Sequence, residues 1–517
     1  MQSLSWIERN KVILILLICC LGFFLRFYAL GGESYWFDEK MSLYFSQKDL
    51  VSILNPPSSE TQIPPLYYIL LHFWIGLVGT SEFAVRSLSA IFGSLSIVAL
   101  YKLGKYLFNV KIAIYSSLIL AVSIFQIYFS QEARMYSLLT LTTIISIFFF
   151  LKSLNENRLR FWASYIIVSI LMLYSHLYGI FILIFQFFYL VFYYRNKIGY
   201  VKNGLIAFSL IILGFFPWLI KLFGVTPYIL EGYSAIAWIP EPNVIVVLGT
   251  VLIFCNSSVV SLLVFGYSIR RIFQLDGLKK RFYKASFSGS LKRIKAYFLD
   301  SSKFNINFCF LWMGIPIILA LSISLILQPI YLPKYLILVS PAFYLLISHG
   351  LAKMKPKIRY ILVLILLIDS VLISYSYYTQ FNKEQWREAA SYIQEREDVG
   401  DLIIINAPWL KINFEHYYNG SNVIRGVQTV DQLNEALLTV EHQKLWLILS
   451  HDTVADPDGQ VKKELDNTYQ LNSKNEFMSQ NILNDISIFG YIINTDYSTK
   501  IEIYYYSKYP WSIGRAR

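Results

Sequence analysis

The chain has 517 residues, of which 56% are hydrophobic and only 15% are charged, whereas a soluble globular protein carries about 25% charged residues. This composition excludes an ordinary soluble domain, and the apolar residues come in long runs that are typical of a multi-pass membrane protein. The net charge of +12 does not indicate nucleic-acid binding, because most of the basic excess lies in connections between apolar runs.

Charge is divided unevenly along the chain. Residues 1–378 contain 32 Lys and Arg against 14 Asp and Glu, a balance of +18. Residues 379–517 contain 13 against 19, a balance of −6. We therefore expect two domains, a transmembrane domain over 1–378 and a small extracytoplasmic domain over 379–517.

Apolar runs long enough to cross a bilayer recur through the first of these parts. We predict about eleven transmembrane helices with interfacial helices between them, so the expected fold class is an α-helical polytopic membrane protein. The predicted spans are 12–30, 83–101, 112–129, 136–151, 161–175, 177–194, 204–223, 244–267, 305–327, 335–352 and 359–378.

The run QIPPLYYILLHFWIGLVG (62–79) opens with two prolines and ends among glycines. A span here would reverse the orientation of everything that follows, so we predict a helix lying in the membrane interface. Lys and Arg then concentrate in the connections on one side of the membrane. The positive-inside rule predicts a plasma-membrane protein with a cytoplasmic N-terminus, and with the first loop and the C-terminal domain extracytoplasmic.

The C-terminal part reads as a small α/β unit. The stretch KEQWREAASYIQERED has helical spacing of its apolar residues. The stretches DLIIINAP, KLWLILS and KIEIYYYS are rich in β-branched and aromatic residues, which favour strands.

Two adjacent carboxylates follow the first predicted span. Asp38 and Glu39 lie in SYWFDEKMSLYF (34–45), where the neighbouring residues are mostly apolar. A loop carboxylate often does no more than face water. Near hydrocarbon, however, a carboxylate can keep a raised pKa and act as a base, so we regard Asp38 and Glu39 as candidate catalytic residues.

A second polar segment is FSQEARMYSLL (129–139), a short link between two predicted spans on the same side. We expect Glu132 and Arg134 to lie at the membrane surface, either as an interfacial ion pair or as an anion site that Tyr136 supports. Arginine suits the second role because its guanidinium offers a fixed fork of donors to phosphate oxygens.

Two further segments on that side carry polar candidates. Lys334 and Tyr335 open a predicted span in QPIYLPKYLILVSPAFYLL (328–346), where Lys334 is either a snorkelling anchor or a second phosphate ligand. His176 lies in YSHLYG at the outer end of a short span, where packing is the simplest role and substrate binding the alternative.

Two arginines lie inside predicted spans. Arg26 is in the first span near its outer end, and Arg86 is at the start of the second. A charge at such a depth is unfavourable unless it is paired, and Asp38 or Glu39 is the partner that we expect for Arg26.

These segments resemble a known family. LRFYALGGESYWFDEKMSL followed by PPLYYILLHFW is similar to the first extracytoplasmic loop of GT-C glycosyltransferases, in particular the protein O-mannosyltransferase branch (glycosyltransferase family 39-like) that includes the lipid A aminoarabinose transferase. SQEARMYSLLTL, LYSHLYG and YLPKYLILVSPAFYLL follow in the family's order, and the resemblance covers about residues 1–410.

The resemblance implies a sugar donor carried on a polyprenyl or dolichyl phosphate and an extracytoplasmic lipid, glycan or protein acceptor. It also implies that Asp38 is the catalytic base, with Glu39 beside it, and that Arg134 binds the donor phosphate. Many relatives have arginine where this chain has Lys334, which places phosphate contact there in question. Because the polyprenyl phosphate leaves as a stabilised anion, one carboxylate suffices as base, and attack from the opposite face inverts the anomeric centre.

Two other function classes stay open at this stage. A polysaccharide ligase or polymerase would use a diphospho-linked donor, and a transporter would carry ionisable residues at mid-membrane. The sequence shows no close His/Asp cluster, although the carboxylates could recruit a divalent metal ion. Asp369, inside the last predicted span, has no explanation in this scheme.

Overall fold

The computed structural model describes residues 6–57, 62–230, 239–275, 304–438, 444–479 and 500–508. It divides into two compact units. Unit 1 comprises Met1–Leu30 and Phe45–Ser374, and unit 2 comprises Gly31–Tyr44 and Tyr375–Arg517. Residues 31–44 were expected in the transmembrane domain, whereas in the structure this segment packs with the C-terminal part of the chain.

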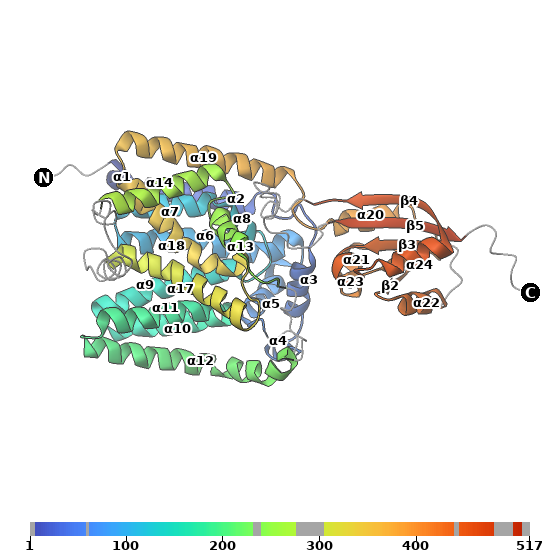
Figure 1. Cartoon of the computed structure of the whole chain (residues 1–517), viewed down its shortest axis with the longest axis horizontal. Helices are drawn as coiled ribbons and strands as arrows, with labels where there is room; N and C mark the ends of the chain where they lie inside the picture. The colour runs from blue at the N-terminus through green and yellow to red at the C-terminus, as the bar shows by residue number, and fades with distance from the viewer. Residues whose placement is uncertain are drawn as a thin grey trace, which may run out of the picture. The chain divides into compact units, whose positions relative to one another are not determined.

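Unit 1 is a bundle of helices that lie side by side (Figure 1). Its described helices, in chain order, are α1 (Trp6–Arg9), α2 (Lys11–Phe27), α4 (Leu50–Leu54), α5 (Leu66–Val78), α6 (Glu82–Leu107), α7 (Val110–Val122), α8 (Ile124–Ser130), α9 (Tyr136–Glu156), α10 (Leu159–Ser175), α11 (Gly179–Tyr194), α12 (Ile198–Leu230), α13 (Val244–Phe254), α14 (Val259–Leu275), α17 (Phe304–Ile326), the 3-10 helix η3 (Pro333–Val339), α18 (Ser340–Ala352) and α19 (Pro356–Thr379).

The predicted fold class is confirmed. In the described ranges six helical segments are long and apolar enough to cross a bilayer, namely α6, α9, α12, α17, η3 with α18, and α19. The bent pairs α7–α8 and α13–α14 pass the same test together. The other three predicted spans coincide with α2, α10 and α11, which have 17, 17 and 16 residues and measure about 25 Å.

The run at 62–79 forms α5, a helix of 13 residues. At about 20 Å it is shorter than the hydrocarbon core of about 30 Å, so it does not replace a span. It packs on α6, where the Trp74 indole donates to the Ala84 carbonyl and the Ser87 hydroxyl, each at 3.0 Å.

Two predicted spans are broken, which hydropathy alone could not indicate. The chain turns by 58° between α7 and α8 and by 89° between α13 and α14. The amide side chain of Asn256 connects the two breaks, because its Oδ1 accepts from the Ile124 amide at 3.1 Å. Its Nδ2 donates to Ser370 on α19 at 2.9 Å, so a buried polar side chain satisfies backbone that the helices leave open.

Unit 2 contains the segment 31–44, which begins α3 (Phe37–Ser46), and a five-stranded sheet of order β2-β1-β3-β5-β4. Strands β2, β1 and β3 are parallel, and β5 and β4 are antiparallel to their neighbours. The elements are α20 (Trp386–Gln394), β1 (Leu402–Ile405), η4 (Pro408–Leu410), α21 (Lys411–Tyr417), β2 (Val423–Gly426), α22 (Val430–Leu438), β3 (Lys444–Leu449), α23 (Asp452–Ala455), α24 (Gln460–Thr468), β4 (Tyr469–Phe477) and β5 (Ile501–Lys508).

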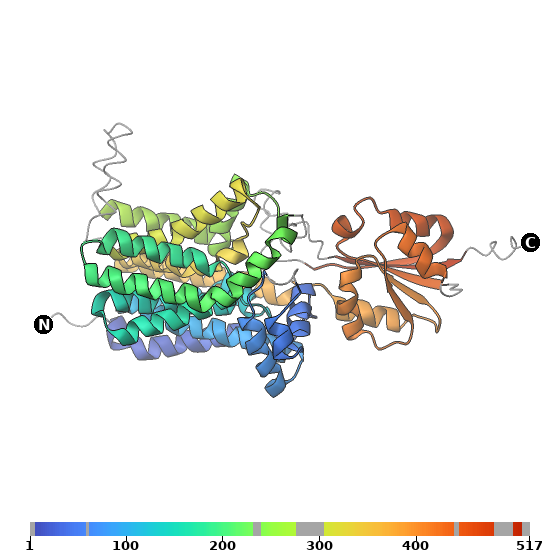
Figure 2. The same ribbon diagram turned by 90° about the horizontal axis from the view of Figure 1, so that it is seen from below.

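Helices cover both faces of this sheet (Figure 2). The central strand β1 is buried along its whole length. Ile403 and Ile405 face one core, which includes Trp386 of α20, while Leu402 and Ile404 face the other, which includes Leu465 of α24. The predicted helix and the three predicted strands are α20, β1, β3 and β5. The edge strands β2 and β4 were not predicted, because their residues are mostly exposed and polar.

Candidate active site

Three connections of unit 1 bring together polar residues that are far apart in the sequence. Arg134 lies between α8 and α9, His176 between α10 and α11, and Lys334 at the start of η3. Together with Tyr136 and Tyr335 they form what we call the Arg134–Lys334 cluster. Both cations act electrostatically on the His176 ring and on Tyr136, so the cluster is positively charged.

Lys334 is held among aromatic rings. Its Nζ lies 6.0 Å from the Tyr136 ring centroid and 5.6 Å from that of Tyr335. The two tyrosine rings stack at 6.3 Å. An ammonium over aromatic faces is stabilised without being neutralised by them, so the two rings hold Lys334 and leave it charged.

Arg134 is fixed by the short helix α5. Its guanidinium donates to the Tyr68 hydroxyl at 3.3 Å, and its backbone carbonyl accepts from Ser89 of α6 at 3.0 Å. Ser89 in turn shares a hydrogen bond of 2.8 Å with Tyr67. Two successive tyrosines of α5 therefore position Arg134. Tyr68 contacts its side chain, and Tyr67 acts on its backbone through Ser89.

His176 is partly buried beside Tyr335, with ring centroids 4.9 Å apart. Burial, followed by the charges of Arg134 and Lys334, lowers the pKa of the His176 imidazole to about 3. The ring is therefore neutral at physiological pH. Its Nδ1 accepts from the Tyr178 amide at 3.1 Å, which places the proton on Nε2 and makes that nitrogen a donor.

Glu132 lies deeper than expected. Only 1% of Glu132 and 7% of Arg134 are exposed in the structure, so the protein itself encloses both side chains. The preceding residue, Gln131, fixes the link between α8 and α9 to the end of α2. Its Nε2 donates to the carbonyls of Leu25, Arg26 and Tyr28 at 2.8–3.3 Å. The segment is therefore a fixed internal link, and Glu132 provides a negative charge beside Tyr136.

Arg26 and Arg86 are fully buried and support backbone. The Arg26 guanidinium donates to the carbonyls of Gly22, Ala121 and Leu120 at 3.0–3.1 Å, which ties α2 to the end of α7. Arg86 donates to the Leu30 carbonyl at 3.0 Å. These contacts explain how both charges are accommodated, and the pairing of Arg26 with Asp38 or Glu39 stays a prediction.

The two carboxylates of the first loop differ sharply in their surroundings within unit 2. Glu39 is fully buried, and its Oε1 lies 2.8 Å from Nζ of Lys383, which is itself 5% exposed. Asp38 is partly exposed and lies close enough to Glu384 for its charge to raise the pKa of that carboxyl. The environment thus separates a fully buried carboxylate, Glu39, from one that is partly exposed to solvent, Asp38.

Lys383, Glu384 and His451 were not predicted from the sequence. The stretch KEQW was expected to begin a helix, although α20 begins only at Trp386. A lysine and a glutamate directly after the last apolar run were the available signal. His451 Nε2 lies 3.4 Å from Glu384 Oε1, a contact that no spacing could indicate.

The predicted site residues are distributed over both units. Asp38 and Glu39 belong to unit 2, and Arg26, Arg86, Glu132, Arg134, Tyr136, His176, Lys334 and Tyr335 belong to unit 1. That the two groups share one site stays a prediction. No three His, Cys, Asp or Glu side chains among the residues described here are arranged to hold a metal ion, so we assign no metal ligands.

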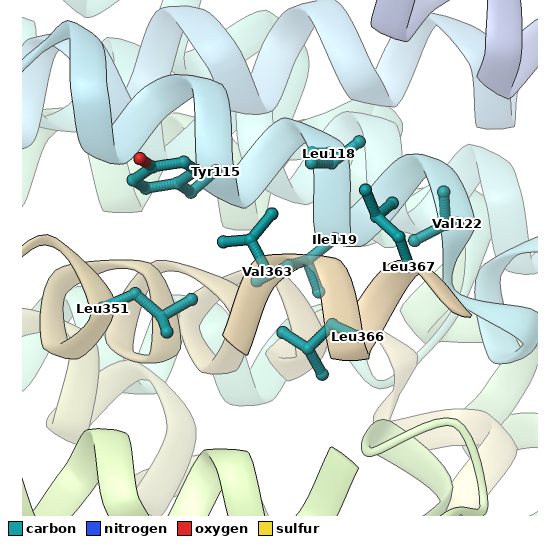
Figure 3. A pocket seen from close by; sticks show the side chains of 8 residues that line it. All are labelled: Tyr115, Leu118, Ile119, Val122, Leu351, Val363, Leu366 and Leu367. Carbon is teal, nitrogen blue, oxygen red and sulfur yellow. The ribbon is translucent and has the colours of Figure 1, made fainter. Parts of the chain in front are cut away.

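Unit 1 also contains an apolar pocket between α7, α18 and α19 (Figure 3). It is lined by Tyr115, Leu118, Ile119, Val122, Leu351, Val363, Leu366 and Leu367. None of the predicted site residues lines it, and its surface suits a hydrocarbon chain better than a sugar or a phosphate.

One protein family matches the part of the chain that contains Arg134 and His176 of the Arg134–Lys334 cluster. Residues 62–220 match the family described as dolichyl-phosphate-mannose-protein mannosyltransferase. This match includes α5, Arg134, Tyr136 and His176. No curated protein sequence matches the chain.

Solved structures share the fold along almost the whole chain. ArnT from Cupriavidus metallidurans in the apo state has 12% identity and a TM-score of 0.57, covering 96% of this chain and 98% of its own. The same protein bound to undecaprenyl phosphate has 11% identity and a TM-score of 0.55, covering 96% and 97%. The apo oligosaccharyltransferase of Archaeoglobus fulgidus has 10% identity and a TM-score of 0.53, covering 87% and 71%.

At these identities the solved structures show only the shared fold. The family match is independent of them, because it rests on the sequence of residues 62–220. Both agree with the resemblance drawn from the sequence. The chain therefore has a multi-pass membrane fold that it shares with the ArnT and archaeal oligosaccharyltransferase structures, and its residues 62–220 match the dolichyl-phosphate-mannose-protein mannosyltransferase family, in agreement with the resemblance to GT-C glycosyltransferases drawn from the sequence.

Proposed function

We propose that this protein transfers a sugar from a polyprenyl-phosphate donor to an extracytoplasmic lipid, glycan or protein acceptor, with inversion at the anomeric carbon. The observation that carries the proposal is the Arg134–Lys334 cluster. Two cations and a neutral imidazole converge there from three separate connections. The ArnT structure that shares the fold is bound to undecaprenyl phosphate, a ligand of the same chemical class.

The cluster is suited to a phosphate in three ways. Arg134 provides a planar set of donors that α5 holds in place, which favours two-point contact with phosphate oxygens. Lys334 adds a second positive charge, which the two tyrosine rings hold in place. His176 adds a neutral N–H donor, which binds an anion without titrating near pH 7.

The chemistry then needs one base. Asp38 takes the proton of the acceptor hydroxyl as its oxygen attacks the anomeric carbon, while the bond from that carbon to the phosphate oxygen breaks. The electron pair of that bond leaves on the polyprenyl phosphate. Arg134 and Lys334 stabilise the charge that develops on the phosphate, so a protonating acid is unnecessary, unlike in glycoside hydrolysis.

The difference between the two loop carboxylates supports Asp38 as the base. Glu39 is engaged with a buried lysine, which removes it from the acceptor. The proposed orientation places Asp38 and Arg134 on the extracytoplasmic side of the plasma membrane.

The test uses the full chain in lipid nanodiscs with a panel of undecaprenyl-phosphate-linked sugars. Mass spectrometry would measure the release of undecaprenyl phosphate. Arg134→Gln and Lys334→Gln should each raise KM for the donor about 10–100-fold, the equivalent of one charge-assisted hydrogen bond. Asp38→Asn should lower kcat about 100–10,000-fold, the usual contribution of a general base.

Matched controls separate these effects from general damage. Arg160→Gln removes an exposed arginine of unit 1, and Glu415→Gln removes an exposed carboxylate of unit 2; both should behave as the wild type. An Asp38→Asn variant with wild-type turnover would remove the base assignment. Consumption of a diphosphate-linked donor alone would favour a polysaccharide ligase instead.

A further inference from the structure

The loop that carries Asp38 is fastened to the C-terminal part of the chain by a dense set of hydrogen bonds. The Ser34 hydroxyl donates to the Glu384 carbonyl at 2.5 Å and accepts from the Trp386 amide at 3.1 Å. The Tyr35 amide donates to the Tyr417 hydroxyl at 2.7 Å. The Asn382 amide donates to Glu33 at 2.9 Å. All of these partners belong to unit 2.

The centre of this contact is the ion pair between Glu39 and Lys383. The Nζ–Oε1 distance is 2.8 Å, and the two side chains are 0% and 5% exposed. A buried charge is tolerated only with its partner, and removing one member leaves the other uncompensated. Lys383 is in turn fixed, because its backbone carbonyl accepts from Ser479 at 2.6 Å.

Because Asp38 and Glu39 are neighbours in one helix, fixing Glu39 also fixes the direction of Asp38. Both carboxylates lie in the first turn of α3, and successive residues of a helix point about 100° apart. When Glu39 is turned inward onto Lys383, Asp38 is therefore turned away from it. The observed burial agrees, since Glu39 is fully buried and Asp38 is partly exposed.

A second group of the same segment lies beside Asp38. The Glu384 carboxylate accepts from the Trp386 indole at 2.6 Å and lies 3.4 Å from His451 Nε2. Burial, and then the charge of Asp38, raise the pKa of the Glu384 carboxyl. Asp38 is thus near a side chain that the sheet domain holds in place through His451.

We propose that Lys383 is a positioning residue for the loop that carries Asp38, because it fixes, through Glu39, the direction in which Asp38 points within unit 2. Lys383 acts through Glu39 and does not touch the substrate. The inference rests on the proposed function in one respect, the assignment of Asp38 as the base. The contacts that orient the loop do not depend on that assignment.

The test compares Lys383→Gln, Lys383→Arg, Glu39→Gln and the double variant Glu39→Gln/Lys383→Gln, each as the full chain in nanodiscs. Lys383→Gln should lower kcat about 100-fold, the effect of a misplacement of about 1 Å, and leave KM for the donor within about twofold. Lys383→Arg keeps the charge and should recover most of the rate. The double variant leaves no unpaired charge, so its kcat should be at least about tenfold higher than that of Lys383→Gln.

Hydrogen–deuterium exchange of the peptide covering 31–46 provides a readout that does not need activity. Lys383→Gln should increase exchange there about tenfold or more, while the peptide covering 129–136 of unit 1 stays unchanged. Lys411→Gln is the matched control, because Lys411 is a lysine of unit 2 that is 36% exposed and paired only across one helical turn with Glu415 in the contacts described.

The outcomes distinguish the two proposals. If no polyprenyl-phosphate sugar is used by the wild type but exchange in 31–46 rises in Lys383→Gln, the proposed function fails and the positioning of the loop stands. Wild-type kcat and wild-type exchange in Lys383→Gln would overturn the inference. Strictly additive effects of the two single variants on kcat would also overturn it, because Lys383 would then not act through Glu39.

Discussion

Ser261 of α14 holds Asp369 of α19: its hydroxyl donates to one carboxylate oxygen at 2.6 Å, and Ser258 donates to the other at 2.7 Å. Ser258 also accepts from the amides of Val260 and Ser261, so the carboxylate lies at the N-terminal end of α14. A negative charge is favourable there because of the helix dipole. The structure thus explains the one charge inside a predicted span that the sequence left unexplained.

Replacing Asp369 should therefore destabilise unit 1. Asp369→Leu removes two hydrogen bonds to a charged acceptor and should lower the unfolding free energy by about 2–5 kcal/mol. Asp369→Asn keeps a hydrogen-bond acceptor, so its unfolding free energy should fall by less. Thermal unfolding in detergent would measure both, with Val371→Ala, an exposed position of α19, as control. An unchanged midpoint in Asp369→Leu would contradict the capping role.

The Tyr68 hydroxyl should matter through Arg134. Tyr68→Phe removes the acceptor at 3.3 Å without removing the ring, so Arg134 becomes free to take other rotamers. We expect KM for the donor to rise about tenfold with little change in kcat, the equivalent of one hydrogen bond. Steady-state kinetics with a polyprenyl-phosphate sugar would measure it. Phe45→Leu, which alters packing on the Tyr68 ring but leaves its hydroxyl, is the comparison, and an equal rise in KM there would point to packing instead.

His176 should make the protein less stable in acid. Its pKa is lowered from the ordinary 6.5 to about 3 in the folded protein, so the unfolded chain binds the proton more readily between these values. Stability should then fall as pH drops below about 6.5, by at most about 1.4 kcal/mol per pH unit. The His176→Gln variant should not show this loss of stability below about pH 6.5. Unfolding midpoints of both proteins from pH 8 to pH 4 would show it, and parallel curves would show that His176 does not titrate as inferred.

Lys334→Arg tests the one departure from the family pattern. Arginine restores a planar donor fork at this position, and the Tyr136 and Tyr335 rings that hold the ammonium also suit a guanidinium. We expect KM for the donor to stay equal or fall by up to about tenfold, whereas Lys334→Gln should raise it. A Lys334→Arg variant as impaired as Lys334→Gln would mean that the ammonium has a role other than phosphate binding.

Much of unit 1 could be predicted because a bilayer imposes one length and one composition on every span. The eleven runs all correspond to helices or bent helix pairs. The break at Ser123 could not be predicted, because the Ile124 amide that it leaves open is taken up by a side chain 132 residues away, that of Asn256 in the second break.

The candidate site was predictable only where a single segment carries the chemistry. Arg134, Lys334 and His176 stood out as polar residues in apolar surroundings, and the side assignment from loop charges agrees with their convergence. Lys383 and His451 did not stand out, because a lysine and a histidine in a polar domain are ordinary. Their significance comes from contacts that no local spacing indicates: Lys383 pairs with Glu39, 344 positions away, and His451 lies beside Glu384.

That separation has a consequence for how the chain is made. Residues 31–44 leave the ribosome early, but Lys383 and Trp386 follow only after the last span has been synthesised. Closing so long a loop is slow compared with forming local helices. The loop with Asp38 therefore acquires its final conformation at the end of biogenesis, and a chain truncated before Lys383 would contain Arg134, His176 and Lys334 but lack the contacts that order the proposed base.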